Sequence, residues 1–201
     1  MTEEIVLEKH SVLVSDGKVA KICKRSRDCR HKGAERINGT GKFLIPGLTD
    51  MHAHTEPAMI PAIPEAMAAM LKRAQTQQLR QYVTFGVTTT HDTAGGPNNL
   101  KIREEILAGE RLGSRIFTSK GAMDGDPRLH PATIAFGDPE VAADYVRQTA
   151  AEGYDTVKIY STLQKPVFDA IMDAAVESGI PVIVHVPMPI DMEYVLQLSL
   201  I

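Results

Sequence analysis

Residues 44–57 read LIPGLTDMHAHTEP. An apolar run is closed by Pro-Gly, and two histidines, His52 and His54, then lie two residues apart. Side chains alternate along a β-strand, so both imidazoles share one face of the strand while Met51 and Ala53 take the other. Imidazole is the commonest metal ligand among side chains, and two on one face can both reach one ion. The segment therefore predicts a strand that carries a pair of metal ligands.

From residue 44 onward, strand-like and helical segments alternate. Strands are predicted at 48–54, 86–93, 114–120, 154–160 and 181–187, and helices at 61–84, 98–112, 139–153, 166–178 and 190–201. This alternation is typical of parallel βαβ units. The repeat length favours part of an eight-fold (β/α) barrel. A doubly wound open sheet is the alternative, but it should carry a glycine-rich phosphate loop after its first strand, and HAHTEPAM is not one.

Local signals add detail to the helices and to the segment before one of them. Asp138 and Pro139 form a good N-cap and first turn for the helix that runs to Gly153. Residues 121–139 are expected to form a loop. Helical spacing in 61–84 brings apolar side chains onto or near one face: Met67, Met70, Leu71, Ala74, Leu79 and Tyr82. In 166–178 the inward side chains are expected to be Phe168, Ile171, Met172 and Ala175.

The first 43 residues differ from the rest. They contain β-type runs joined at Asp16-Gly17, a dipeptide that favours a tight hairpin. A polar, basic stretch follows and is expected to be a solvated loop. We therefore divide the chain into a small β segment, 1–43, and a barrel segment, 44–201.

Composition excludes several classes of protein. The 201 residues carry a formal net charge of −3, which gives no electrostatic case for nucleic acid or an anionic membrane. No apolar stretch approaches the ~20 residues that span a bilayer. The chain starts with acidic residues where a signal peptide would be basic, so a cytoplasmic location is expected. Two cysteines, Cys23 and Cys29, are too few for a disulfide framework.

The same alternation applied to the fourth and fifth strands adds two nitrogen-bearing side chains. Lys158 shares a face with Thr156 and Tyr160, and His185 shares a face with Ile183. A lysine inside a barrel is costly unless it is neutralised or paired. Together with the first strand, these strands aim His52, His54, Lys158 and His185 at one axial volume near the carboxyl ends of the strands. An open site of this kind is what catalytic zinc requires.

Three further residues are substrate-binding candidates. Tyr160 shares the inward face of Lys158, and packing at the barrel mouth is its alternative role. His91 ends the second strand, where capping of the next loop is the alternative. His130 lies in the long loop after the third strand, a position where binding residues are often found.

Four segments, PGLTDMHAH, GVTTTHDT, TVKIY and PVIVHV, resemble the amidohydrolase superfamily of metal-dependent hydrolases. The similarity extends from about residue 12 to residue 200, and the stretch GVTTTHDT…SRIF…VKIY is most similar to imidazolonepropionase-like and Xaa-Pro-dipeptidase-like members. The resemblance implies a (β/α)₈ TIM-like barrel joined to a small β-sandwich. This chain would supply about five βα units of the barrel and part of the sandwich.

The resemblance also implies the chemistry of the site. His52 and His54 correspond to ligands of the more buried ion, and His185 to a ligand of a second ion. Lys158 corresponds to a lysine that CO₂ carboxylates in two-metal members, so that it bridges the ions. One or two divalent ions, most often zinc, would activate a hydroxide that attacks an amide, ester or amidine carbon. Members with a single ion make no use of the lysine.

The family pattern also includes a histidine at the end of a sixth strand and an aspartate at the end of an eighth. No residue here matches either, so this chain is expected to be an incomplete version, with a missing C-terminal half or a homo-oligomer covering its open edges. The favoured function is hydrolysis of C–N bonds in small molecules: a non-peptide amide, a cyclic amide or a dipeptide. The alternatives are a deaminase and an inactive remnant that binds a metal or a partner.

Overall fold

The computed structural model describes residues 6–55 and 65–198. The chain divides into two compact units, Met1–Ile45 and Pro46–Ile201. None of the described helices is long and apolar enough to cross a membrane.

The first unit is built on a hairpin. Strands β1 (Ser11–Ser15) and β2 (Lys18–Cys23) pair antiparallel, and Asp16 and Gly17 turn between them with φ of 53° and 69°. Positive φ at both turn residues is the geometry that Asp-Gly favours, which confirms the predicted hairpin. A short 3₁₀ helix, η1 (Ser26–Cys29), interrupts the basic stretch that was expected to be a loop.

A disulfide joins the two cysteines of this unit, a pairing that their number alone did not predict. Cys23 ends β2 and Cys29 ends η1, so the turn of η1 returns the second cysteine to the first. The bridge closes a short loop between two secondary-structure elements.

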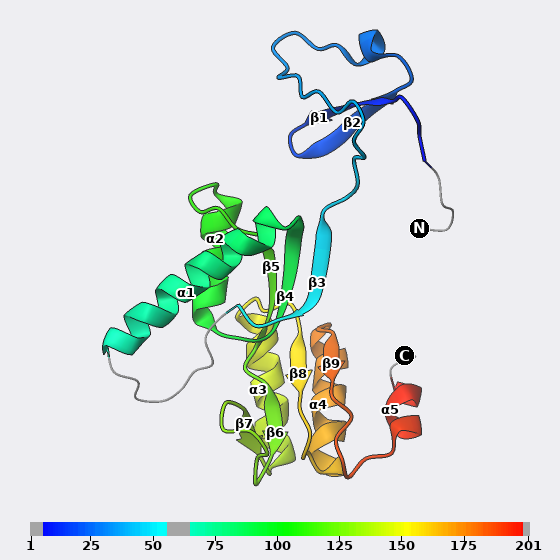
Figure 1. The fold of residues 1–201 in the computed structure, drawn as a ribbon. Helices are drawn as coiled ribbons and strands as arrows, with labels where there is room; N and C mark the ends of the chain where they lie inside the picture. The colour runs from blue at the N-terminus through cyan, green and yellow to red at the C-terminus, as the bar shows by residue number, and fades with distance from the viewer. Residues whose placement is uncertain (1–5, 56–64, 199–201) are drawn as a thin grey trace. The chain divides into compact units, whose positions relative to one another are not determined.

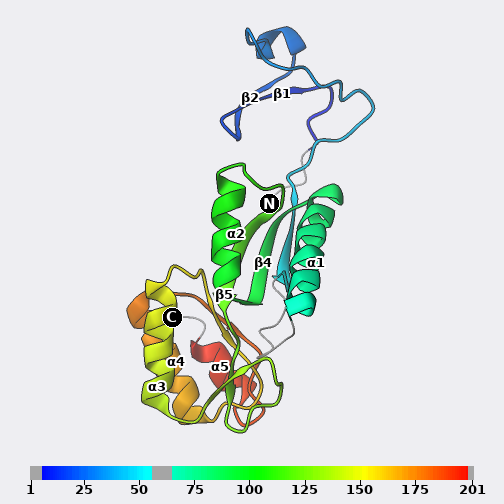
Figure 2. The ribbon, with the colours of Figure 1, turned by 90° about the vertical axis from the view of Figure 1, so that its left-hand side faces the viewer.

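The second unit alternates strands with helices. Its elements are β3 (Leu48–Ala53), α1 (Glu65–Thr84), β4 (Val87–Gly95), α2 (Pro97–Leu107), β5 (Arg115–Lys120), β6 (Met123–Gly125), β7 (Ile134–Phe136), α3 (Pro139–Ala151), β8 (Val157–Ile159), α4 (Lys165–Ser178), β9 (Val182–Val184) and α5 (Met192–Leu198). Figure 1 shows them in order along the colour gradient. Helices α1 and α2 lie on one face of the sheet formed by β3, β4 and β5, as two views show (Figures 1 and 2).

The strands of this unit form parallel pairs in two sheets, ordered β3-β4-β5 and β7-β6-β8-β9. A parallel bridge between Ser119 and Thr156 joins the end of β5 to the start of β8. Because β6 follows β5 closely and also pairs with β8, β5 and β6 together occupy one strand position. In chain order the five neighbouring positions are β3, β4, β5 with β6, β8 and β9. This arrangement confirms the predicted α/β class and is that of an incomplete barrel.

The main hydrophobic core of the unit lies between α3, α4 and the strands β8 and β9. Phe168, Ile171 and Ala175 of α4 are buried there as predicted, and Met172 packs against them partly buried. The start of α3 is also as predicted, because the Asp138 side chain accepts hydrogen bonds from the backbone N–H groups of the first turn. A smaller cluster of Leu79, Ile102 and Ile116 lies under α1 and α2.

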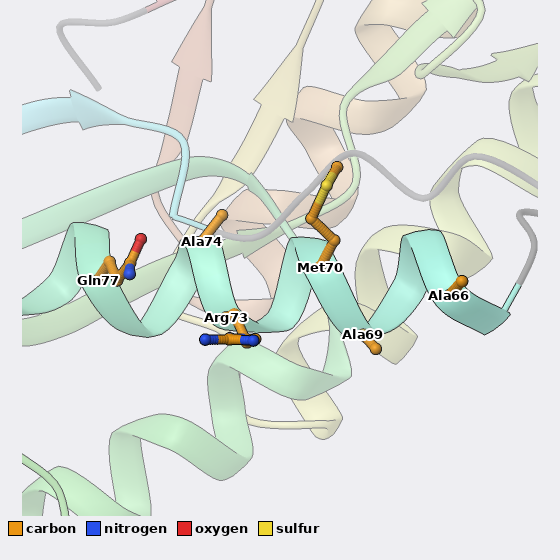
Figure 3. Close-up of a pocket in the computed structure, with 6 residues that line it drawn as sticks. All are labelled: Ala66, Ala69, Met70, Arg73, Ala74 and Gln77. Atoms are coloured by element: carbon orange, nitrogen blue, oxygen red, sulfur yellow. The ribbon is translucent and has the colours of Figure 1, made fainter.

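The apolar face predicted for α1 is only partly buried. Leu79 is fully buried, but Met67 and Met70 are 44% and 61% exposed, and Ala74 is exposed too. Gln75 and Leu79 are the buried side chains of this helix that the structure describes, and the exposed methionines lie nearer its start. A pocket of about 430 Å³ lies on that exposed face. Figure 3 shows the side chains of α1 that line it: Ala66, Ala69, Met70, Arg73, Ala74 and Gln77.

Two further expectations need correction. The helix predicted at 98–112 ends at Leu107, and Gly109 adopts a φ of 74° soon after, a left-handed conformation typical of a helix end. The loop predicted at 121–139 contains β6 and β7, which pair with each other; strands this short leave too weak a pattern to be predicted. Residues 61–64 and 199–201 of the predicted helices lie outside the described residues.

Candidate metal centre

Strand ends bring together the three histidines that the sequence singled out. His52 lies in β3, His54 follows the end of that strand, and His185 follows β9. The ring centroids of His52 and His54 are 5.3 Å apart, and those of His52 and His185 are 5.9 Å apart. The backbone N–H of His185 donates to the carbonyl of Ile159 at 3.1 Å, which ties the end of β9 to β8. Residues 133 positions apart in the chain therefore meet at the carboxyl ends of the strands.

Lys158 lies in β8, and only 3% of it is exposed. Within residues 6–55 and 65–198, its Nζ atom has no hydrogen-bond acceptor or anionic partner. Burial therefore lowers the pKa of this amine. Burial also lowers the pKa of both His52 and His185, and the charge of Lys158 lowers each further. The three nitrogen-bearing groups thus lie within electrostatic reach of one another, and the pKa of each is shifted in the direction that favours the neutral form.

A row of aromatic rings extends from His185 to the loop after β6. The rings of Tyr160 and His185 are 5.0 Å apart, and those of His130 and Tyr160 are 6.3 Å apart. Tyr160 is half-buried, whereas His130 is exposed in its loop. Both substrate-binding candidates therefore lie on the same side as the histidines of the strand ends.

His91 is placed differently from the other candidates. Its Nε2 atom lies 2.8 Å from the hydroxyl of Thr156, and it is nearly fully buried in β4. Burial is the main cause of its lowered pKa. The neighbouring Asp92 makes a local hydrogen bond within β4, where its Oδ1 atom accepts from the backbone N–H of Ala94 at 2.9 Å.

Two buried carboxylates, Asp92 and Asp124, have hydrogen-bond partners that sequence reasoning did not predict. Asp92 accepts hydrogen bonds from Thr55 and Asn99, and Asp124 accepts from Thr162, Leu129 and Gly125 among others. Both are 0% exposed. Burial alone would raise the pKa of Asp124, but the donated hydrogen bonds outweigh it and lower that pKa.

The only sequence signal for these carboxylates was an aspartate near the end of a strand. Asp124 stands in the motif DGDP, which resembles an ordinary turn. Its partner Thr162 lies 38 residues away, and Thr55 lies 37 residues from Asp92. Such contacts are invisible to local patterns.

The donor set suits a divalent ion in part. Two imidazoles on one zinc ion have ring centroids about 5 Å apart, given Zn–N bonds of about 2.1 Å, and the two histidine pairs are close to that spacing. Ligation needs neutral imidazole, which the lowered pKa of His52 and His185 favours. However, no group of three or more histidine, cysteine, aspartate or glutamate side chains in the described part of the chain is placed to hold an ion. The described side chains therefore offer a divalent ion pairs of imidazoles near Lys158, and not a complete set of ligands.

Comparison with known proteins gives short sequence matches and extensive structural ones. No family model matches the chain. Over 47 residues, 23% of the chain, it is 40% identical to an N-acetylglucosamine-6-phosphate deacetylase from Lysinibacillus sphaericus, and the match covers 11% of that protein. A solved putative prolidase from Bifidobacterium longum is 28% identical, with a TM-score of 0.63 over 85% of this chain and 42% of its own.

Two other solved structures share the fold at lower identity. A prolidase in complex with N-methylphosphonate-L-proline has a TM-score of 0.74 at 20% identity, and an amidohydrolase has 0.71 at 18%. Each match covers 88% of this chain and 51% of the other protein. The chain thus spans about half the length of these proteins. Its structural neighbours include an amidohydrolase and prolidases, which confirms the resemblance to the amidohydrolase superfamily seen in its sequence.

Proposed function

We propose that this chain holds the metal centre of a hydrolase that cleaves C–N bonds in small molecules by metal-activated hydroxide. The observation that carries the proposal is the meeting of His52, His54 and His185 at the strand ends, beside the buried amine of Lys158. The prolidase and deacetylase names among the similar proteins support C–N bonds as the target. The substrate would be a non-peptide amide, a cyclic amide or a dipeptide.

His52, His54 and His185 would provide imidazole nitrogens to one or two divalent ions, with zinc the first choice. A bound ion supplies an activated water at neutral pH and polarises the scissile carbonyl. Lys158 would add a fourth donor after modification. Its neutral Nζ would attack the carbon of CO₂; as the N–C bond forms, one C=O π pair moves to oxygen and the nitrogen releases a proton to water, which gives a carbamate with two oxygen donors. The lowered pKa of Lys158 favours the neutral amine that this step needs.

Tyr160 and His130 would bind the substrate. Their rings continue the row that begins at His185, so a small molecule held at the metal would lie against them. His91 would contact the substrate from a more buried position, where its hydrogen bond with the Thr156 hydroxyl holds the ring. The prolidase neighbour with bound N-methylphosphonate-L-proline supports a small-molecule substrate.

We propose a cytoplasmic location and no nucleic-acid or membrane partner, in keeping with the net charge of −3. A homo-oligomer or the second half of a longer protein would cover the open edges of β3 and β9.

The test is a hydrolysis screen with the purified chain. N-acetyl amino sugars, cyclic amides and Xaa-Pro dipeptides are incubated with zinc, with a chelator and with the His54→Asn variant. Turnover of one class that needs zinc and is lost in the variant would support the proposal, and it would contradict the expectation that this chain is an incomplete version. Metal binding without turnover of any class would favour the non-catalytic remnant, and turnover that resists the chelator would contradict the proposal.

A further inference from the structure

Asp92 stands out among the buried charged side chains that the proposed mechanism does not use. Its Oδ2 atom accepts three hydrogen bonds: from the backbone N–H of Thr55 at 2.6 Å, from the hydroxyl of Thr55 at 2.7 Å and from the Asn99 amide at 2.8 Å. Its Oδ1 atom accepts from Ala94 at 2.9 Å. The carboxylate is 0% exposed, and Thr55 is 1% exposed.

These hydrogen bonds hold the segment that carries the histidine pair. Thr55 directly follows His54, and β3 has already ended at Ala53. The pairing of β3 with β4 is also irregular between Asp50 and Ala53, so a regular ladder does not fix the backbone around His52. Past the end of the strand, the carboxylate of Asp92 holds Thr55 by two short bonds, and Gln78 donates to the carbonyl of His54 at 3.1 Å.

We propose that Asp92 is a positioning residue for the metal centre: by fixing Thr55 it sets where β3 presents His54 and His52. The inference rests on the proposed function. A direct role as a ligand does not fit, because Oδ2 already accepts from three donors and Oδ1 from a fourth. Hydrogen bonds to groups that orient metal ligands affect metal affinity strongly, and their loss typically costs about 10- to 100-fold.

Asp124 offers a matched control. It is also 0% exposed and accepts a similar set of hydrogen bonds, but its donors lie at the end of β6, in the loop after β6 and past the end of β8, and none of them is next to the histidine pair in the chain. The Asp92→Asn and Asp124→Asn variants therefore both remove a buried charge with several donors. A purely structural role of Asp92 would make the two variants alike in metal affinity.

The experiment measures Co²⁺ affinity of the full 201-residue chain by visible absorption and chelator competition, with a thermal melt of each variant. We expect both variants to unfold at a lower temperature than the wild type. Asp92→Asn should bind Co²⁺ about 10- to 100-fold more weakly with an altered absorption band, and Asp124→Asn should bind like the wild type. Equal affinity of Asp92→Asn and the wild type would overturn the positioning role and leave the proposed function intact. A wild-type chain that binds no Co²⁺ would overturn both.

Should Asp92→Asn show no melting transition, Thr55→Val decides. This variant keeps the hydrogen bond from the backbone N–H of residue 55 to Asp92 and removes only the bond from the Thr55 hydroxyl. A Co²⁺ affinity several-fold below that of the wild type, in a chain that still melts cooperatively, supports the inference. Affinity equal to that of the wild type overturns it.

Discussion

The carboxylate of Asp124 organises the loop that follows β6, and its removal gives a prediction whose size can be worked out. Its Oδ1 atom accepts from the backbone N–H groups of Gly125 and Thr162 and from the Thr162 hydroxyl. Its Oδ2 atom accepts from the backbone N–H of Leu129 and the hydroxyl of Thr133. The loop that it shapes carries His130 toward Tyr160.

Asp124→Ala removes all of these acceptors, but some donors have a second partner. The hydroxyl of Thr162 also reaches the carbonyl of Pro127, and Gly125 N–H also reaches the Thr162 hydroxyl. The hydroxyl of Thr133 likewise reaches a backbone carbonyl. The backbone N–H groups of Leu129 and Thr162 lose the acceptor that holds them. Both hydrogen bonds are part-buried, so water can replace part of each. At about 1–3 kcal/mol for each lost hydrogen bond to the carboxylate, the free energy of unfolding should fall by about 2–6 kcal/mol.

In Asp124→Asn the free energy of unfolding should fall by less, about 1–3 kcal/mol. The amide keeps one oxygen acceptor, and only its NH₂ group is placed against hydrogen-bond donors. The pKa of Asp124 is lowered in the folded chain, so its ionised form stabilises the fold above the unfolded value of about 3.9, and this contribution is lost as pH falls through the folded pKa. The difference between wild type and Asp124→Asn should therefore be full at pH 7 and shrink below about pH 4.

The assay is urea unfolding followed by circular dichroism at pH 7 and at steps from pH 5 to pH 3. Exposed Asp144→Asn serves as the control, with an expected change within about 0.5 kcal/mol. A loss in Asp124→Ala no larger than that of the control, or a difference between wild type and Asp124→Asn that stays constant down to pH 3, would refute this reasoning.

Three further predictions concern the core and the site. Phe168→Ala empties the centre of the main core, and the free energy of unfolding, measured with urea, should fall by about 3–5 kcal/mol; a loss under about 1 kcal/mol would show that this ring does not fill the core. Tyr160→Phe keeps the ring beside His185 but removes the hydroxyl, so KM should rise about 2- to 10-fold with unchanged Co²⁺ affinity; an unchanged KM would remove Tyr160 from the binding site. Bicarbonate should strengthen metal binding by the wild type, and Lys158→Ala should abolish that effect; stimulation that persists in the variant would exclude carboxylation of this lysine.

Local patterns predicted the parts of the fold that depend on near neighbours. The Asp16-Gly17 turn, the Asp138 cap and the inward face of α4 each depend on a few adjacent residues. Strand alternation also predicted that His52 and His54 share a face, and the structure places His185 and Lys158 within reach of that pair. The metal-binding roles of these residues remain predictions.

The remaining features depend on contacts that no local pattern carries. Met67 and Met70 have helical spacing like core residues, but whether they are buried depends on what packs against the first turns of α1. The Cys23–Cys29 bridge depends on the turn of η1. Asp92 and Thr55 are 37 residues apart in the chain, and only the pairing of β3 with β4 brings them together next to the histidine pair.

Zinc content measured by plasma mass spectrometry tests the central claim most directly. The wild-type chain and its His52→Asn and His54→Asn variants are expressed in zinc-supplemented medium and purified side by side. The control is the His10→Asn variant, which changes a histidine outside the site. We predict about one or two zinc ions per chain in the wild type and in His10→Asn, and a clear loss in both site variants. A wild-type chain without zinc, or site variants that retain it in full, would contradict the account.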